Sequence, residues 1–235
     1  MNPDVTDLAI LLDRSGSMEE RRQDHEGGLR AFVRDQRALA GDVRLTFVQF
    51  DSHDPFELIY DRTPLPEVRE DRLVLVPRGS TPLLEAMSRT LDHLGTRLIG
   101  EPPHPVVVMV ITDGRENASR PAYTKARIKA QVDTRTTRDG WTILYLGANV
   151  DAFAEAGGLA IPSEHALPYA ATPKGVHQAY ASVGANIRGY RAAVGRGMTI
   201  GAAAASNLAF TEDQRRAAKP DDDPTTPTTK PEGKV

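Results

Sequence analysis

The chain has 235 residues, enough for one domain with an appendage, and it contains no cysteine, which excludes disulfides, thiolate catalysis and Cys-ligated metal sites. Its 29 Lys and Arg residues are nearly balanced by 32 Asp and Glu residues, so the basic surplus that nucleic-acid binding requires is missing. Because no stretch approaches the roughly 18–20 apolar residues of a membrane helix and the N-terminus resembles no secretory signal, we expect a cytoplasmic protein without nucleic-acid or membrane partners.

Apolar runs alternate with helical patterns along the chain, an order that is typical of an α/β fold with a mostly parallel sheet. The run 8–12 is continuously apolar, as expected of a central strand that is covered on both faces. In chain order, the first half predicts a strand over 8–12, a helix over 29–39, a strand over 43–50, edge segments at 56–60 and 72–76, and a helix over 84–98 that Thr81 and Pro82 begin.

The second half of the sequence continues the same alternation. It predicts a strand over 106–111, a helix over 122–138, a strand over 141–146, a short strand over 166–169 and a long helix over 173–194. We therefore expect one doubly wound α/β domain over residues 1–200, with helices on both faces of the sheet. We expect residues 201–235 to form a C-terminal extension that lacks regular structure from about residue 211, because Asp, Thr and Pro replace apolar residues there.

Oxygen-bearing side chains are concentrated where the first strand ends. Asp13, Ser15 and Ser17 follow that strand at intervals of two residues, and Gly16 allows the tight turn that would bring them together. The carboxyl end of a central parallel strand is where open α/β sheets bind ligands. Carboxylate and hydroxyl oxygens favour Mg²⁺, Mn²⁺ or Ca²⁺. A helix N-cap explains the same residues equally well when this segment is taken alone.

Two further segments carry oxygen ligands at comparable places. Asp113 and Gly114 follow the strand 106–111, so that Asp113 would lie at the same edge of the sheet as Asp13. Thr81 lies in the loop before a predicted helix. Ordinary turn chemistry accounts for Asp113 taken alone, and an N-cap hydroxyl before a proline accounts for Thr81.

Together, the three segments resemble the metal-ion-dependent adhesion site (MIDAS) of von Willebrand factor A (vWA) domains. All positions of that motif are present: Asp13, Ser15, Ser17, Thr81 and Asp113. The stretches 13–18, 112–119 and 146–149 are most similar to small stand-alone vWA proteins of bacteria and their phages. The resemblance implies a divalent cation, Mg²⁺ or else Mn²⁺ or Ca²⁺, at the top of the sheet. It also implies that Ser15, Ser17 and often Thr81 touch the ion, while both aspartates act largely through bound water.

The resemblance further implies a function in protein–protein interaction. An ion held mainly by neutral hydroxyls keeps most of its positive charge, so an open coordination position would attract an Asp or Glu carboxylate of a partner protein. Residues expected at the rim of the site, where they would contact that partner, are Arg14, Ser80, Arg115 and Asn149. The alternative for each of them is an ordinary solvated side chain or a local ion pair.

No catalytic set accompanies these residues in the sequence. The histidines form no metal-type pair at short spacing, and neither a Gly-x-Ser-x-Gly elbow nor a Gly-x-x-x-x-Gly-Lys phosphate loop is present. We therefore do not expect an enzyme. Two alternatives are kept: a metal-dependent phosphohydrolase on the same scaffold, and a scaffold protein of a phage or stress-response system in which the metal is purely structural.

Overall fold

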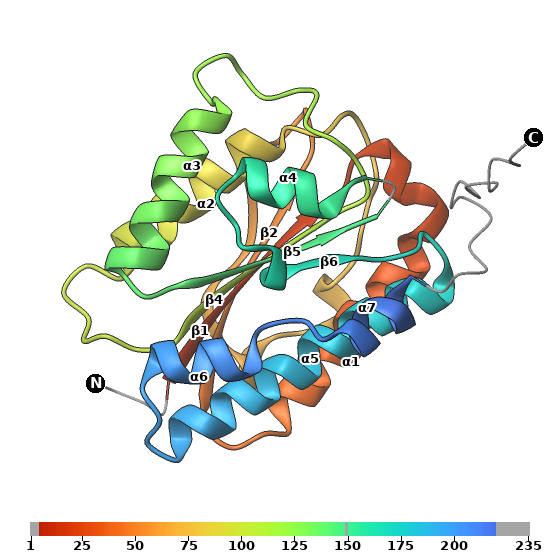
Figure 1. Cartoon of the computed structure of the whole chain (residues 1–235). Coiled ribbons are helices and arrows are strands. Elements are labelled where there is room, and N and C mark those ends of the chain that lie inside the picture. The colour runs from red at the N-terminus through yellow and green to blue at the C-terminus, as the bar shows by residue number, and fades with distance from the viewer. Residues whose placement is uncertain (1–4, 149, 220–235) are drawn as a thin grey trace, which may run out of the picture.

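The computed structural model describes residues 5–148 and 150–219, which form a six-stranded sheet with the strand order β3-β2-β1-β4-β5-β6 (Figure 1). The strands are β1 (Val5–Asp13), β2 (Asp42–Phe50), β3 (Glu57–Pro64), β4 (Val106–Thr112), β5 (Thr142–Gly147) and β6 (Ala166–Pro168). Neighbouring strands are parallel except β2 and β3, which are antiparallel. The predicted doubly wound, mostly parallel sheet is confirmed.

Helices cover both faces of the sheet (Figure 1). One face carries α1 (Arg22–Arg37), α5 (Pro173–Gly195), α6 (Ile200–Asn207) and α7 (Glu212–Ala218), and the other carries α2 (Leu83–Arg97), α3 (Lys125–Asp133) and α4 (Ala152–Gly158). Shorter turns are η1 (Gly16–Arg21), η2 (Leu65–Glu67), η3 (Glu70–Arg72), η5 (Ser163–His165) and the π-helical turn η4 (Thr134–Arg138). Across the described residues, none of the helices combines the length and the apolar run that crossing a membrane would take.

Side chains of β1 alternate between the two cores. Ile10 and Leu12 pack on the face of α1 and α5, whereas Ala9 and Leu11 pack on the face of α2. Both β1 and its neighbour β4 are buried along their whole length. The loops that follow these two strands therefore start from the most tightly packed part of the sheet.

The segment 72–76, which the sequence predicts as an edge strand, consists instead of the last residue of η3 and the loop that follows it. Leu73 and Leu75 are buried in the core on the α1 face. The side chain of Gln49 donates a hydrogen bond to the Val74 carbonyl, and the Leu75 N–H donates one of 2.9 Å to Glu26. The alternation of apolar residues therefore reflects one buried side of a loop and not strand pairing.

The domain continues beyond residue 200, which corrects the predicted boundary. Ala203 of α6 and Ala218 of α7 are fully buried in the core that α5 covers. α7 begins with a capping box at Thr211, and Gln214 donates a hydrogen bond of 2.7 Å to Asn186 on α5. The expected loss of regular structure is therefore wrong for residues 211–219, where a cap and buried contacts outweigh the low apolar content. The rest of the predicted tail, 220–235, lies outside the described residues.

Candidate metal centre

The predicted ligands lie where the strand order changes direction, between β1 and β4. Asp13 ends β1 and Thr112 ends β4. Thr112 Oγ1 donates a hydrogen bond of 2.6 Å to Asp13 Oδ2, and the Ser15 N–H donates one of 2.7 Å to Asp13 Oδ1. Both carboxylate oxygens of Asp13 thus accept hydrogen bonds, and its side chain is completely buried.

Hydroxyl groups connect the loop after β1 to Asp113 in the loop after β4. The Oγ atoms of Ser15 and Ser17 lie 3.1 Å apart, and Ser17 Oγ donates a hydrogen bond of 2.6 Å to Asp113 Oδ1. Ser15 is buried, whereas Ser17 is exposed and Asp113 is half-buried. The oxygen atoms of this set therefore extend from the core to the solvent.

Thr81, in the loop before α2, lies close to Ser17 and to the loop that carries Asp113. A methyl group built on Gly114 would lie 3.1 Å from Thr81 Oγ1 and 4.0 Å from Ser17 Oγ, so both hydroxyls border the same small space beside Gly114. Thr81 is only 2% exposed. The structure thus brings the loops of Asp13, Thr81 and Asp113 together at one edge of the sheet.

The loop that carries Thr81 is tied to its neighbours by backbone hydrogen bonds. The Gly16 N–H donates to the Gly79 carbonyl at 3.1 Å, and the Ser52 N–H donates to the Ser80 carbonyl at 2.9 Å. In return, the Ser80 N–H donates to Ser52 Oγ at 3.0 Å. Gly79 has a φ of 65°, and a Cβ there would lie 2.5 Å from Ser52 Oγ, so both conformation and space favour glycine at this position.

The hydroxyls of Ser15 and Thr81 do not cap helices. Ser15 precedes η1 without a side-chain capping bond. The residue directly before α2 is Pro82, so Thr81 lies one position outside the N-cap of that helix. The first N–H groups of α2 donate instead to Glu116 and Ser119, which lie in the loop after β4. The N-cap alternative for Ser15 and Thr81 is therefore excluded, and both hydroxyls are available for another role.

The two aspartates lie in surroundings that disfavour their charges. Burial raises the pKa of the Asp13 carboxyl to about 6, and the nearby charge of Asp113 adds to the rise, although hydrogen bonds from neighbouring groups act in the opposite direction. The pKa of Asp113 is also raised, first by burial and then by the charge of Glu20. A divalent cation would offset this cost, and a donor set of carboxylates and hydroxyls fits Mg²⁺, Mn²⁺ or Ca²⁺.

The predicted rim residues differ in their accessibility. Ser80 and Arg115 are exposed at this edge, whereas Asn149 lies outside the described residues. Arg14 is not at the rim, which corrects the prediction: its side chain is 5% exposed and forms ion pairs with Asp51 and Glu57. Arg14 therefore forms a local ion pair, the alternative role expected for it, because the buried carboxylate of Asp51 requires a cation beside it.

Asp51 is a structural residue of this edge that the sequence motifs did not single out. It is completely buried directly after β2, and it accepts hydrogen bonds from two N–H groups of its own turn and from Arg78. Burial opposes its ionisation, but these hydrogen bonds hold its pKa below the usual value. Asp51 thereby fixes the turn against which the Thr81 loop rests. The sequence could have indicated Asp51, because it follows a predicted strand, as Asp113 does.

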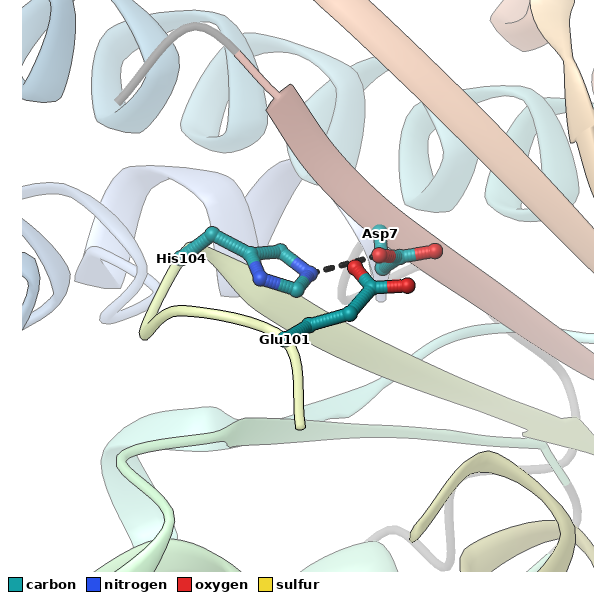
Figure 2. Close-up of side chains that lie close together, drawn as sticks. All are labelled: Asp7, Glu101 and His104. Carbon is teal, nitrogen blue, oxygen red and sulfur yellow. Dashed lines mark hydrogen bonds and ion pairs between the residues drawn. The ribbon is translucent and has the colours of Figure 1, made fainter. Parts of the chain in front are cut away.

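A second group of possible metal ligands, drawn in Figure 2, includes Asp7 near the start of β1 and so lies at the opposite end of the sheet. Asp7, Glu101 and His104 place their ligand atoms within 4.8 Å of one another. Asp7 and Asp13 both lie on β1, six positions apart, which corresponds to roughly 20 Å along a strand. The guanidinium of Arg62 donates to both carboxylate oxygens of Asp7, at 2.8 and 2.9 Å, and to Glu101 Oε2 at 2.8 Å.

His104 completes the charge balance of this group. Its Nδ1 lies 2.9 Å from the Pro102 carbonyl and its Nε2 lies 2.6 Å from Asp7 Oδ2, so both ring nitrogens donate when the imidazole is protonated. The hydrogen bond with Asp7 raises the pKa of His104, while burial opposes that rise. Because Arg62 and His104 already supply positive charge to the two carboxylates, we interpret this group as an ion-pair network and not as a second metal centre.

Comparison with solved structures identifies the fold of the chain. A von Willebrand factor type A protein from Catenulispora acidiphila has a TM-score of 0.58 and 16% identity, with 79% of this chain and 43% of that chain covered. Proximal thread matrix protein 1 from the mussel byssus, with a zinc-occupied MIDAS motif, has a TM-score of 0.58 and 17% identity, with 77% and 47% covered. The pilus adhesin SpaC from Lactobacillus rhamnosus GG has a TM-score of 0.60 and 14% identity, with 80% and 31% covered.

These comparisons support the fold and not a common activity. The chain spans less than half the length of each of the three solved chains. No family model matches the chain, and no curated protein matches it. The resemblance that the sequence motifs indicate is confirmed at the level of architecture: the chain has the von Willebrand factor A fold.

Proposed function

We propose that this chain is a divalent-metal-dependent protein–protein interaction module, in which a bound Mg²⁺ bridges to an acidic group of a partner. The observation that carries the proposal is the convergence of three loops whose oxygen atoms extend from buried Asp13 to exposed Ser17. A cation at this edge would have protein oxygens on its inner side and solvent on its outer side. The outer side is where a partner's carboxylate would bind.

The residues of the centre would have different tasks at the ion. Ser15, Ser17 and Thr81 offer neutral hydroxyl oxygens, which leave most of the positive charge on the metal. Both oxygens of Asp13 already accept hydrogen bonds from the chain, so Asp13 suits a role through bound water. Asp113 is half-buried and bonded to Ser17, so it would act at the outer edge. A bound ion would supply a positive charge that attracts a partner's carboxylate.

Exposed residues beside the centre would contribute to partner choice. Arg115 is exposed in the loop that carries Asp113, and its guanidinium is suited to a bidentate contact with a carboxylate. Ser80 is exposed next to Thr81 and would contact the partner beside the ion. We expect these two side chains to affect which acidic partner binds more than they affect metal affinity.

We propose binding and not catalysis for this centre. The side chains joined by hydrogen bonds here are hydroxyls and carboxylates, without an assembled acid–base or nucleophile set. Two of the structurally similar proteins are a pilus adhesin and a byssus matrix protein, which supports an interaction role. The cytoplasmic location and the bacterial or phage origin that we expect from the sequence stay predictions.

An array of short peptides tests this proposal even while the partner is unidentified. Each peptide contains one Asp or Glu, and a counterpart carries Asn or Gln at the same position. In Mg²⁺, the chain should bind a subset of the acidic peptides and none of their amide counterparts. Removal of the metal by EDTA should abolish that binding.

Two variants make the peptide experiment specific to the proposed centre. Asp13→Asn should lose binding of the acidic peptides. Asp213→Asn, at a position on α7 whose side chain is 91% exposed, is the matched control and should bind like the wild type. Retention of the same acidic peptides in EDTA would show that the metal does not form the bridge.

A further inference from the structure

The loop after β4 holds Thr81 by both of its backbone groups. The Thr81 N–H donates a hydrogen bond of 2.8 Å to Asn117 Oδ1, and the Asn117 N–H donates one of 3.1 Å to the Thr81 carbonyl. Gly114, in the same loop, lies directly beside the Thr81 hydroxyl. The residue that would offer its hydroxyl to a cation is thus fixed by the loop that also carries Asp113.

The same loop also caps α2. Glu116 Oε2 accepts a hydrogen bond of 2.8 Å from the Leu84 N–H, and Ser119 Oγ accepts one of 2.9 Å from the Glu85 N–H. The Ser119 hydroxyl donates to Glu116 at 2.7 Å, which holds the two capping side chains together. A carboxylate at this position is favourable because the first N–H groups of a helix lack partners within the helix. The hydroxyl of Thr81 is therefore not drawn into capping.

An ion pair between exposed Arg120 and buried Glu85 fixes the far end of the loop. Glu85 on α2 is 1% exposed, and Arg120 Nε donates a hydrogen bond of 2.9 Å to its carboxylate. Two further N–H groups, of Ala118 and Ser119, donate to Glu116 Oε1 at 2.9 and 2.7 Å. The loop between β4 and α3 is therefore bonded internally and to α2, so it can act as a rigid support.

We propose that Asn117 and Glu116 are positioning residues of the metal centre, which hold Thr81 and the start of α2 against the Asp113 loop and so keep the Thr81 hydroxyl directed to the cation. This inference rests on the proposed function, because it assigns both residues to the same centre. A merely structural role for Asn117 leads to a different expectation. In that case its removal would lower stability and leave the affinity for the cation unchanged.

Calorimetric titration of the full chain with Mg²⁺ tests the role of Asn117. In Asn117→Ala the dissociation constant for Mg²⁺ should rise about ten- to hundredfold, and amide hydrogen exchange at Thr81, measured without metal, should become faster. Asn117→Asp keeps an acceptor oxygen in place of Oδ1, so it should restore slow exchange and tight binding. Asn186→Ala, which removes the hydrogen bonds of α5 with Gln214 on α7 and with the Ala209 carbonyl before α7, is the matched control and should change neither quantity.

The possible results separate this inference from the proposed function. Wild-type Mg²⁺ affinity in Asn117→Ala would overturn the positioning role and leave the proposed function intact. Failure of the wild-type chain to bind Mg²⁺ would overturn the proposed function, and the positioning role with it.

Glu116→Gln supplies a second test if Asn117→Ala does not fold. Both oxygens of Glu116 accept hydrogen bonds from backbone N–H groups, one at the start of α2 and the other from the loop itself. Glutamine keeps the size of the side chain but replaces one of these oxygens by an NH₂ donor, which cannot accept such a bond. Weakened Mg²⁺ binding in this variant supports the positioning role. An unchanged affinity would contradict it.

Discussion

The hydrogen bonds around Thr81 decide between two roles that its sequence position allows. A threonine before a proline is typical of a helix N-cap, and the MIDAS resemblance makes the same residue a metal ligand. In the structure, Glu116 and Ser119 bond the first N–H groups of α2, and the Thr81 hydroxyl borders the space beside Ser17. The role as a ligand therefore explains the hydroxyl better than the role as a cap.

Replacing Thr81 by valine keeps the shape of the side chain and removes only its oxygen. We expect Thr81→Val to weaken Mg²⁺ binding about tenfold or more. The free energy of unfolding without metal should change by less than about 0.5 kcal/mol, since loss of a true N-cap would cost about 1 kcal/mol. Calorimetry and urea denaturation measure the two quantities.

Thr90→Val is the matched control for that substitution. Thr90 lies on α2, is fully buried, and its hydroxyl has no hydrogen-bond partner within the part of the chain that the structure describes. Its variant should bind Mg²⁺ with wild-type affinity. Equal losses of Mg²⁺ affinity in both variants would show that the effect comes from general disturbance of α2.

Buried His25 makes the stability of the chain depend on pH. It lies between Tyr169 and Tyr180, and burial lowers its pKa from 6.5 to about 4. The unfolded chain therefore takes up a proton below pH 6.5 that the folded chain does not, so this residue reduces stability as the pH falls from 6.5 to about 4.

In His25→Gln this contribution is absent. Between pH 7 and pH 5, the free energy of unfolding should therefore fall less in the variant than in the wild type. The difference between the two decreases should be about 2 kcal/mol. Urea denaturation of both proteins at the two pH values measures the difference. Parallel losses in the wild type and in the variant would show that His25 is not kept neutral by the fold.

Packing between α1 and α5 depends on a glycine. A Cβ at Gly28 would lie 2.4 Å from the ring of Tyr180, whereas a Cβ at Gly27 would meet no atom within 4 Å. Alanine normally stabilises a helix relative to glycine. At position 28 the clash with a buried tyrosine opposes this gain.

These adjacent glycines therefore give a matched pair of substitutions. We expect Gly27→Ala to stabilise the protein by about 0.5–1 kcal/mol and Gly28→Ala to destabilise it by about 1–3 kcal/mol. Thermal or urea denaturation measures both values. A stabilising Gly28→Ala would mean that α1 and α5 are further apart than the structure shows.

Elements with a strong local pattern were predictable from the sequence, and elements that depend on distant contacts were not. The apolar run of β4 and the periodic stripe of α5 predict both elements closely. α4 has a small apolar surface of alanines and contains two glycines, and its cap by Asp151 was not evident before the fold was known. The segment 72–76 alternates like a strand, but side chains of Gln49 and Glu26, which are distant in the sequence, bond its backbone in place of a neighbouring strand.

The same distinction holds for the metal centre. Asp13, Ser15, Ser17, Thr81 and Asp113 were chosen because the spacing of a known motif places them at strand ends, and the structure brings their loops together. Arg14 lies within that motif but turns to the buried carboxylate of Asp51, which no local pattern reveals. Asn117 was not predicted for the same reason, since its bond to Thr81 joins residues 36 positions apart.

At the scale of the whole molecule, the two ends of the sheet have different charge arrangements. The carboxyl end gathers hydroxyls and two aspartates with raised pKa values. The amino end pairs Asp7 and Glu101 with Arg62 and His104. The carboxylates at the amino end thus already have positive partners. At the carboxyl end, a bound cation would supply the positive charge that Asp13 and Asp113 lack.

His104→Gln tests whether the amino end stabilises the fold without binding metal. The raised pKa of His104 means that its stabilising contribution is present at low pH and is lost as the pH rises through that pKa. The variant should therefore be less stable than the wild type at about pH 6, with a smaller difference at about pH 9. Its Mg²⁺ affinity should be unchanged, and a clear loss of affinity would assign the metal to this end instead.

We propose that three loops at the carboxyl edge of the sheet surround one divalent cation. Calorimetric titration with Mg²⁺ of the wild type, Asp13→Asn and His104→Gln tests it most directly. We predict saturable binding with one site per chain in the wild type and in His104→Gln, and no binding in Asp13→Asn. Absence of binding by the wild type, or undiminished binding by Asp13→Asn, would contradict the account.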